Sequence, residues 1–190
     1  MLVDMLVTVT RYVGAFFVSM LLLRFFLQWF RIPFRNQLGQ FVMATTNWAV
    51  MPARRVVPSL SGLDVASLIC AWILQAALVA VIDALVGRDL LSAPANAAAT
   101  ILSRAAVDLI QYALQMLFFV LILQVILSWV SPGNTIQYSL DQLTRPMLRP
   151  IRRIVPPIAN VDLSPAILIL VLILIFPLLD RLRVLVDGYF

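Results

Sequence analysis

Four long apolar segments divide the chain, and each is long enough to cross a bilayer, which takes about 20 mainly apolar residues. The pattern predicts transmembrane helices over residues 8–30, 65–86, 105–130 and 164–186. Two shorter stretches lie between the first and second and between the third and fourth segments: GQFVMATTNWAVM and QYSLDQLTRPML. They are too short and too polar to cross, so we expect amphipathic helices at the interface or shallow re-entrant elements.

A short basic phrase occurs in both halves of the chain, as MPARRVVPSLSGLD and as LRPIRRIVPPIANVD. At an offset of 98 residues the matching positions are Thr46, Pro52, Arg54, Arg55, Val57, Pro58 and Asp64 in the first half and Thr144, Pro150, Arg152, Arg153, Val155, Pro156 and Asp162 in the second. At an offset of 100, Leu23, Leu27 and Trp29 match Leu123, Leu127 and Trp129. The chain is therefore a tandem duplication, with a first repeat over 1–90, a linker over 91–104 and a second repeat over 105–190.

The duplication and the arginines predict the topology. Each repeat crosses twice, so both repeats enter from the same side and are parallel, related by a pseudo-twofold axis along the membrane normal. Eight arginines follow the first and third spans, against five on the other side. Because positive charge is retained in the cytoplasm, we expect the basic loops 31–63 and 131–163 to be cytoplasmic and both termini to be periplasmic.

The repeated phrase has two interpretations. Prolines bracket the Arg54–Arg55 pair and predict that the short helix ends near Met51, before a tight basic turn. Asp64 and Asp162 precede the second and fourth spans, where a carboxylate caps a helix. In the first interpretation the arginines bind lipid phosphates and fix topology while the aspartates cap helices. In the second, Arg54 or Arg55 pairs with either aspartate in a charged cluster between the repeats, which binds an anionic ligand or a partner.

Polar side chains recur at matching depth inside the spans. Arg24 and Gln28 lie one helical turn apart, and the duplication places Gln124 and Ser128 at the same positions. Intramembrane charge is costly and marks candidate functional sites. These residues either hydrogen-bond spans one and three together or form the wall of a polar pathway. Three further acids, Asp83, Asp108 and Asp180, lie near the outer ends of their spans and are expected to be solvated or salt-bridged locally.

Composition narrows the chemistry. Mean hydropathy is +1.01, and only 12% of the 190 residues are charged, against roughly 25% in soluble domains; the chain is an all-α polytopic membrane protein. All 14 basic residues are Arg and all nine acids are Asp, with no His. The chain therefore lacks an imidazole base or ligand, and the single Cys70 forms no internal disulfide or paired-cysteine site. We expect no catalysis, no metal and no cofactor.

The duplicated pattern W…T-x5-P-x-RR-x-V-P-x5-D, with its flanking apolar helices, resembles the YggT family of small bacterial integral membrane proteins with tandem YGGT repeats. The resemblance covers nearly the whole chain, although Trp48 of the first repeat matches Pro146 of the second. It implies a multi-pass protein of the bacterial inner membrane with a role in osmotic or extracytoplasmic stress, through potassium or ion homeostasis in some members. Plastid relatives are linked to cytochrome b6 haem attachment. No active site comes with the resemblance.

Three functions follow from these considerations. The first is a non-enzymatic membrane scaffold or assembly factor in stress tolerance. The second is a small channel or transport component for potassium, other ions or osmolytes. It requires the polar residues of the spans to face one wet crevice: Arg24, Gln28, Gln111, Gln115 and Gln124. The third is a cytochrome or haem assembly factor. Expected partners are anionic lipid head groups and other membrane proteins or a second copy; nucleic acid is not expected, because no aromatic stacking pattern accompanies the arginines.

Overall fold

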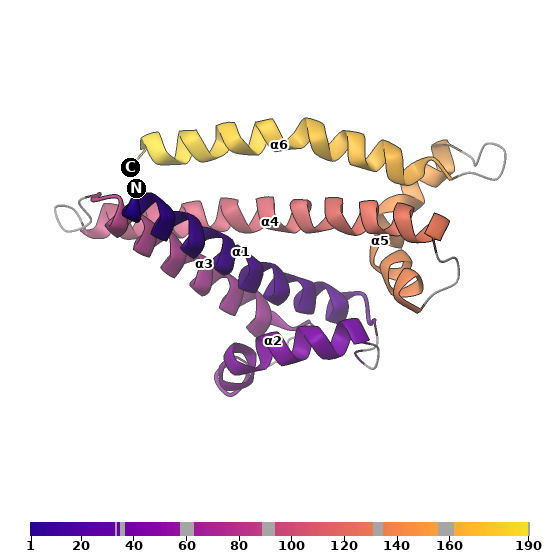
Figure 1. Ribbon diagram of the computed structural model, residues 1–190, viewed down its shortest axis with the longest axis horizontal. Helices are drawn as coiled ribbons and strands as arrows, with labels where there is room; N and C mark the ends of the chain where they lie inside the picture. Colours follow the sequence, from indigo (N-terminus) through magenta and orange to yellow (C-terminus); the bar gives the residue numbers. More distant parts are fainter. Residues whose placement is uncertain are drawn as a thin grey trace.

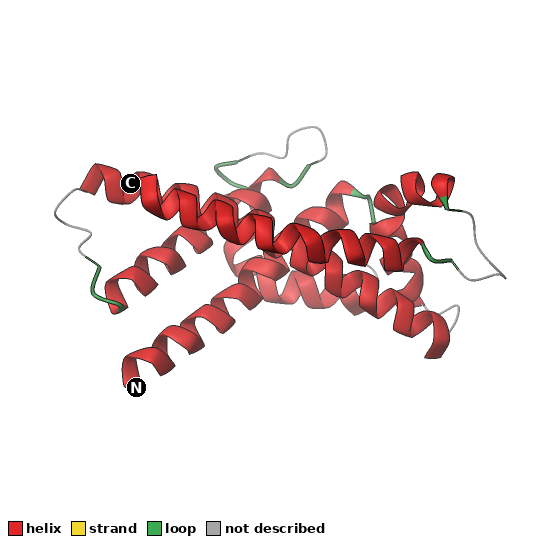
Figure 2. Cartoon of the chain, turned by 90° about the horizontal axis from the view of Figure 1, so that it is seen from above, coloured by secondary structure: helices red, strands yellow, loops and turns green. Residues whose placement is uncertain are grey.

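A computed structural model describes residues 1–32, 34, 37–57, 63–88, 94–130, 135–155 and 162–189. These residues form six α-helices and no β-strand, as Figure 2 shows. In chain order the helices are α1 (Leu2–Trp29), α2 (Gln37–Ala53), α3 (Val65–Leu85), α4 (Pro94–Val130), α5 (Thr135–Ile154) and α6 (Ser164–Tyr189). The predicted all-α fold class is confirmed.

Four of these helices are long and apolar enough to cross a membrane: α1, α3, α4 and α6. They coincide with the four predicted spans, but α4 begins at Pro94, so the predicted linker 91–104 is in large part helix. The sequence explains the longer helix. Proline is favoured at the first helical position, and the Ala-rich segment that follows has high helix propensity.

Each repeat is a hairpin of two long helices with a short helix between them. α1 runs away from the end where both termini lie, α3 returns to that end, and α4 and α6 do the same in the second repeat (Figure 1). The short helices α2 and α5 lie toward the opposite end. Both repeats therefore enter from the same end of the molecule, as the parallel arrangement predicts.

The short helices continue further than the prolines predicted. α5 includes Pro146 and Pro150 and ends at Ile154, so Arg152 and Arg153 lie in its last turn rather than in a turn that follows it. In α2, Pro52 lies inside the helix, while the arginines at 54 and 55 occupy the turn after it. The prediction of a helix end near Met51 was therefore close, since α2 ends at Ala53. These prolines are exposed, so water can satisfy the carbonyls that lose an N–H partner.

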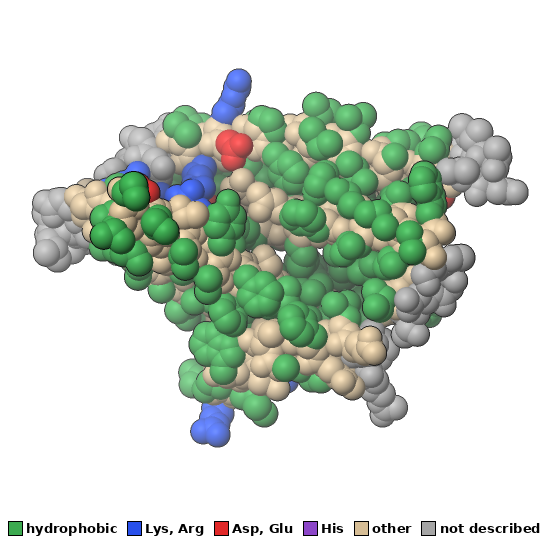
Figure 3. Space-filling view, viewed as in Figure 1, with side chains coloured by type: hydrophobic (Ala, Val, Ile, Leu, Met, Phe, Trp, Pro, Cys, Tyr) green, Lys and Arg blue, Asp and Glu red, His purple; other side chains and the backbone are tan. Residues whose placement is uncertain are grey.

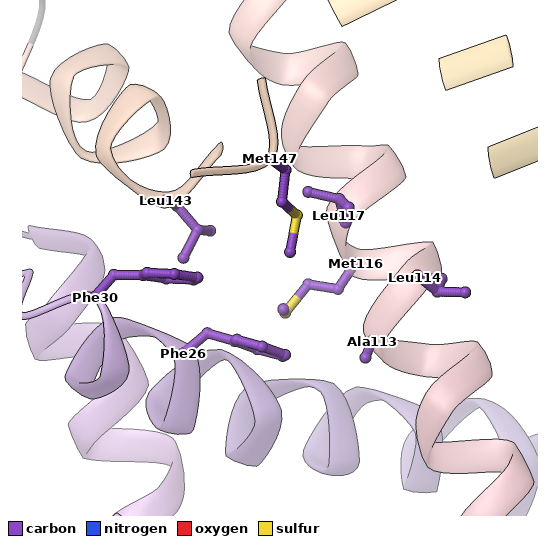
Figure 4. Close-up of a pocket in the computed structure, with 8 residues that line it drawn as sticks. All are labelled: Phe26, Phe30, Ala113, Leu114, Met116, Leu117, Leu143 and Met147. Atoms are coloured by element: carbon purple, nitrogen blue, oxygen red, sulfur yellow. The ribbon is translucent and has the colours of Figure 1, made fainter. Parts of the chain in front are cut away.

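The contact between the repeats is polar toward the end where the termini lie, where Gln75 of α3 donates to Asp108 of α4, and apolar beside α5. There Phe26 of α1 and Phe30, which follows α1, face Met116 of α4 and Leu143 and Met147 of α5 around a small cavity of about 60 Å³ (Figure 4). Charged groups are costly in such surroundings. The interpretation of a charged cluster between the repeats is therefore wrong in its location, since the charged pairs of the repeated phrase form within each repeat, as described below.

The outer surface is largely hydrophobic. Figure 3 shows hydrophobic side chains over most of one face, with Asp and Arg side chains near the end where the termini lie. α6 is the least covered of the candidate spans, with 11% of its most apolar window buried. An apolar helix so little covered by protein requires lipid or another membrane protein around it.

Candidate functional site

A buried carboxylate organises the polar residues of the first repeat. Asp64 precedes α3 and is 1% exposed. Its Oδ1 accepts a weak hydrogen bond from the Ser67 amide at 3.4 Å, and its Oδ2 accepts from the Ser67 hydroxyl at 2.5 Å. Arg54 Nη2 lies 2.6 Å from Oδ2, and Arg24 Nε lies 3.4 Å from the same oxygen. We call Arg24, Arg54, Asp64 and Ser67, with the α2 residues that contact Arg24, the first-repeat cluster.

Arg24 connects the membrane-spanning helix α1 to the short helix α2. The side chain is buried, and its Nη1 donates to Thr46 Oγ1 and to Asn47 Oδ1, each at 2.8 Å. Gln28, one turn further along α1, accepts from Arg54 Nη2 at 3.1 Å. The expectation that the polar residues of span one bond to span three is therefore corrected for Arg24, which bonds to α2, because α2 folds back against α1 and offers nearer partners.

The second repeat builds a related arrangement, which we call the second-repeat cluster. Arg152 Nε lies 2.8 Å from Asp162 Oδ2, and Arg152 Nη2 lies 3.6 Å from Asp141 Oδ1. Thr144 Oγ1 donates to Gln124 Oε1 at 2.7 Å, and Gln124 Nε2 donates to the Asp141 carboxylate at 3.3 Å. Asp162 accepts the Ser164 amide at 2.9 Å, so it caps α6. Both repeats thus join the C-terminal part of a spanning helix, a short helix and the start of the next span.

The two clusters differ in charge and in how tightly side chains fill the space around them. Arg24 of the first repeat corresponds to the neutral Gln124 of the second, and its guanidinium has no counterpart there. A cavity of about 600 Å³ lies beside Gln124 and is lined in part by Ser128, Asp141 and Asp162. Arg145 pairs with Asp141 at 3.5 Å. The second repeat therefore contains space and carboxylates where the first contains a buried cation.

The cap carboxylates are held in their charged form. Burial by itself raises the pKa of Asp64, but hydrogen bonds from Arg54 and Ser67 and the charges of Arg54 and Arg24 outweigh it, so the pKa lies below its ordinary value. Burial also raises the pKa of Asp162, and hydrogen bonds from Ser164 and Arg152 lower it below its ordinary value. Both carboxylates are therefore ionised at neutral pH.

The remaining members of the repeated phrase lie outside these clusters. The side chains of Arg55 and Arg153 are exposed, and neither forms an ion pair with another described residue. Ser128 lies at the edge of the second-repeat cavity. Pro58 and Pro156 lie outside the described residues.

Several polar contacts were missed by sequence reasoning. Asp83 is buried and pairs with Arg104 at 2.7 Å and with Arg88 at 3.2 Å. Asp108 is buried as well; it accepts from Gln75 at 2.7 Å and lies 3.3 Å from Arg183.

The expectation of solvated or locally paired acids is confirmed in part for Asp83, which pairs with the nearby Arg88 although α4 adds Arg104. It is corrected for Asp108, whose partners come from α3 and α6. Asp180 is exposed and accepts from Gln111 at 3.1 Å. The burial of these acids could have been predicted from the apolar residues that share their helix face. Their partners could not have been predicted in that way.

The arrangement offers charge pairing between helices. Across the described ranges, no group of three or more His, Cys, Asp or Glu side chains is placed to hold a metal ion. Cys70 is a free thiol inside α3, and its Sγ contacts the carbonyl of Ala49. The clusters join helices and hold fixed charges.

Comparison with known proteins gives one family. The sequence profile of the CCB3/YggT family matches residues 3–85 and 103–183. The chain is 38% identical to protein YggT of Escherichia coli K12 over 160 residues, covering 84% of this chain and 80% of the relative. It is 36% identical over 153 residues to a Vibrio alginolyticus protein from the proC 3′ region, covering 80% of each. No solved structure shows a significant match.

Proposed function

Because the chain belongs to the CCB3/YggT family, we propose that it is a non-enzymatic scaffold or assembly factor of the bacterial inner membrane that supports osmotic or extracytoplasmic stress tolerance. Four apolar helices are compatible with a multi-pass membrane protein. Family membership is shown, whereas the inner membrane, the role in stress tolerance and the scaffold function are proposed. In this proposal the protein offers two surfaces for binding, one apolar and one basic.

One observation carries the proposal: the five polar residues that a pathway would need are divided among three places. Arg24 and Gln28 bind within the first-repeat cluster. Gln124 lines the second-repeat cavity, and Gln111 and Gln115 line a groove between α1 and α4. A pathway for ions needs polar groups in sequence along one wet channel. Their division among three places supports a structural role over conduction by one chain.

The basic surface has the properties of a docking site. Arg145, Arg149 and Arg153 follow one another at four-residue spacing on the exposed face of α5, while Leu140, Leu143 and Leu148 are buried on its other face. Arg149 and Arg153 form no ion pair with another described residue. Exposed arginines at a membrane interface attract anionic lipid head groups or an acidic surface of a membrane partner.

A complementation assay tests the scaffold. An Escherichia coli strain lacking its own YggT receives this chain or the variant Arg55→Gln/Arg149→Gln/Arg153→Gln, and growth is followed after an osmotic upshift. We expect the chain to restore growth and the variant to fail while it reaches the membrane in equal amount. The matched control is Arg181→Gln, which removes an exposed arginine at the opposite end. Equal growth with all three forms would contradict the basic surface as the working part.

Transport is the second candidate, favoured by the polar second-repeat cavity of about 600 Å³. Potassium flux into liposomes that contain the purified protein decides between the two functions. We expect no flux above that of empty liposomes. Flux that disappears in Arg24→Ala, or in the double variant Arg54→Ala/Arg152→Ala, would replace the scaffold with a transport protein.

A further inference from the structure

A groove between α1 and α4 is built like a binding site for an amphiphile. It has a volume of about 750 Å³, and one long part of it is apolar, lined by Phe16, Met20 and Leu23 of α1 and by Phe119 and Leu123 of α4. Its other end is polar, where Arg11 of α1, Asp108 of α4 and Arg183 of α6 come together. One end of the groove is therefore charged, and the rest is suited to a hydrocarbon chain.

The charged end has an excess of positive charge. Among the lining residues two arginines face one carboxylate: Arg183 Nε lies 3.3 Å from Asp108 Oδ1. Arg11 is exposed and forms no ion pair with another described residue. Asp180 of α6 accepts from Gln111 and does not itself line the groove. The charge left over suits a group with one negative charge, such as a phosphodiester.

The groove is long enough for an acyl chain of one leaflet of a membrane. From Arg11 to Leu23 α1 rises by about 18 Å at its usual rise per residue. Half of a hydrocarbon core of roughly 30 Å is about 15 Å. An acyl chain that starts beneath the arginines therefore has room to reach the bilayer midplane, and the apolar lining continues beyond Leu23 to Leu38 of α2 and Leu140 of α5.

We propose that this groove binds one anionic phospholipid from the leaflet on the side of the chain termini. The phosphate contacts Arg11 and Arg183, and an acyl chain lies against Phe16, Met20 and Phe119. This site is separate from the basic surface of α5, which lies toward the opposite end of the molecule, and it does not depend on the proposed scaffold role. Charge complementarity at the mouth favours a lipid over a second copy of the chain, whose own outer helix α6 is mainly apolar.

The test uses the full chain, purified in detergent and stripped of lipid. Retained phosphatidylglycerol and phosphatidylcholine are counted by native mass spectrometry, and thermal stability is measured with each lipid added. Arg11→Gln removes a cation that has no carboxylate partner, so the fold should survive. We expect its retention of phosphatidylglycerol to be about tenfold weaker, the loss of roughly one charge-assisted hydrogen bond. Arg11→Lys keeps the charge and should retain the lipid.

Two further variants separate a lipid site from a general charge effect. Arg181→Gln removes an exposed arginine of α6 that does not line the groove, and it should bind like the unmodified chain. Ala15→Phe, which adds volume inside the groove, should lose the lipid although the charges remain. Soluble glycerol phosphate should not replace the phospholipid, because it has no acyl chain.

Several outcomes would overturn the proposal. Equal retention of phosphatidylcholine and phosphatidylglycerol would remove the role of charge, and so would equal losses in Arg11→Gln and Arg181→Gln. Stabilisation by glycerol phosphate alone would indicate a site for free phosphate. A second copy as the occupant is tested with Ser19→Cys in a Cys70→Ser background, since position 19 lines the groove. Disulfide-linked dimers in native membranes would replace the lipid with a protein partner.

Discussion

Asp64 is the residue whose substitution we expect to change the free energy of unfolding most. It caps α3, it is almost completely buried, and two guanidinium groups depend on it. A buried ion pair adds little net stability, because desolvation opposes the Coulomb attraction. Removing one partner is different, since the other charge then remains buried and unpaired. The cost of a substitution at this position therefore comes from the arginine it leaves behind.

Asp64→Asn should lower the free energy of unfolding by about 3 kcal/mol or more. The amide can still cap α3, but Arg24, whose side chain is 6% exposed, loses its carboxylate. Thermal unfolding in detergent measures the loss. Asp4→Asn is the control, because the Asp4 side chain is 83% exposed and pairs with the N-terminal amine; it should change stability by less than about 0.5 kcal/mol. Equal shifts of the melting temperature in both variants would show that Asp64 does not stabilise the fold more than an exposed aspartate does.

The pH dependence follows from the same carboxylate. The pKa of Asp64 is lower in the folded protein than its ordinary value of about 4. Its contribution to stability is therefore fully present above the ordinary pKa, and it is lost as pH falls through the lower folded pKa. The melting temperature should fall as the pH drops below about 4, and less steeply in Asp64→Asn. Asp162, whose pKa is lowered too, leaves a residual slope; an unchanged slope in the variant would contradict the assignment.

At the scale of helices, much of the architecture could be predicted from the sequence. The length of the apolar segments predicted the four spans, and the duplicated phrase predicted two hairpin repeats. The end of α5 could not be predicted, because whether an exposed proline is tolerated depends on which face of the helix meets water. Nor could the partner of Arg24 be predicted: Thr46 and Asn47 become its acceptors only once α2 folds against α1.

The difference between the two hairpins leads to a prediction for Gln124. Its side chain lies beside a cavity of about 600 Å³ with two carboxylates on the wall, where the first repeat has an arginine. Gln124→Arg should raise the free energy of unfolding by about 1 kcal/mol through new charge-assisted hydrogen bonds. Gln124→Met, which loses the bonds to Thr144 and Asp141, should lower it by a similar amount. The idea fails if thermal unfolding shows the arginine variant to be the less stable of the two.

At the scale of the whole molecule, we predict that both basic loops lie on one side of the membrane and both termini on the other. Single cysteines at positions 55, 153 and 4, each in a Cys70→Ser background, test this with a membrane-impermeant maleimide. Arg55→Cys and Arg153→Cys should react only after the cytoplasmic side is opened, and Asp4→Cys should react in intact spheroplasts. Labelling of positions 55 and 153 from opposite sides would contradict the parallel arrangement of the repeats.

The groove shows what a sequence does not reveal at this scale. Arg11, Asp108 and Arg183 come from three helices and are far apart along the chain. No local pattern brings them together, since their meeting depends on how α1 and α6 flank α4. The hydrophobic pattern could predict that these helices face lipid, and it could not predict where a charged recess would open between them.

The closed set of contacts around Arg24 has a consequence for biosynthesis. Its described partners lie at positions 46, 47 and 64, all within the first hairpin. A nascent chain needs only this hairpin to neutralise the arginine, before any of the second repeat has left the ribosome. The costly charge therefore enters the bilayer together with its counter-ion, and the insertion machinery can release the first hairpin without waiting for the second.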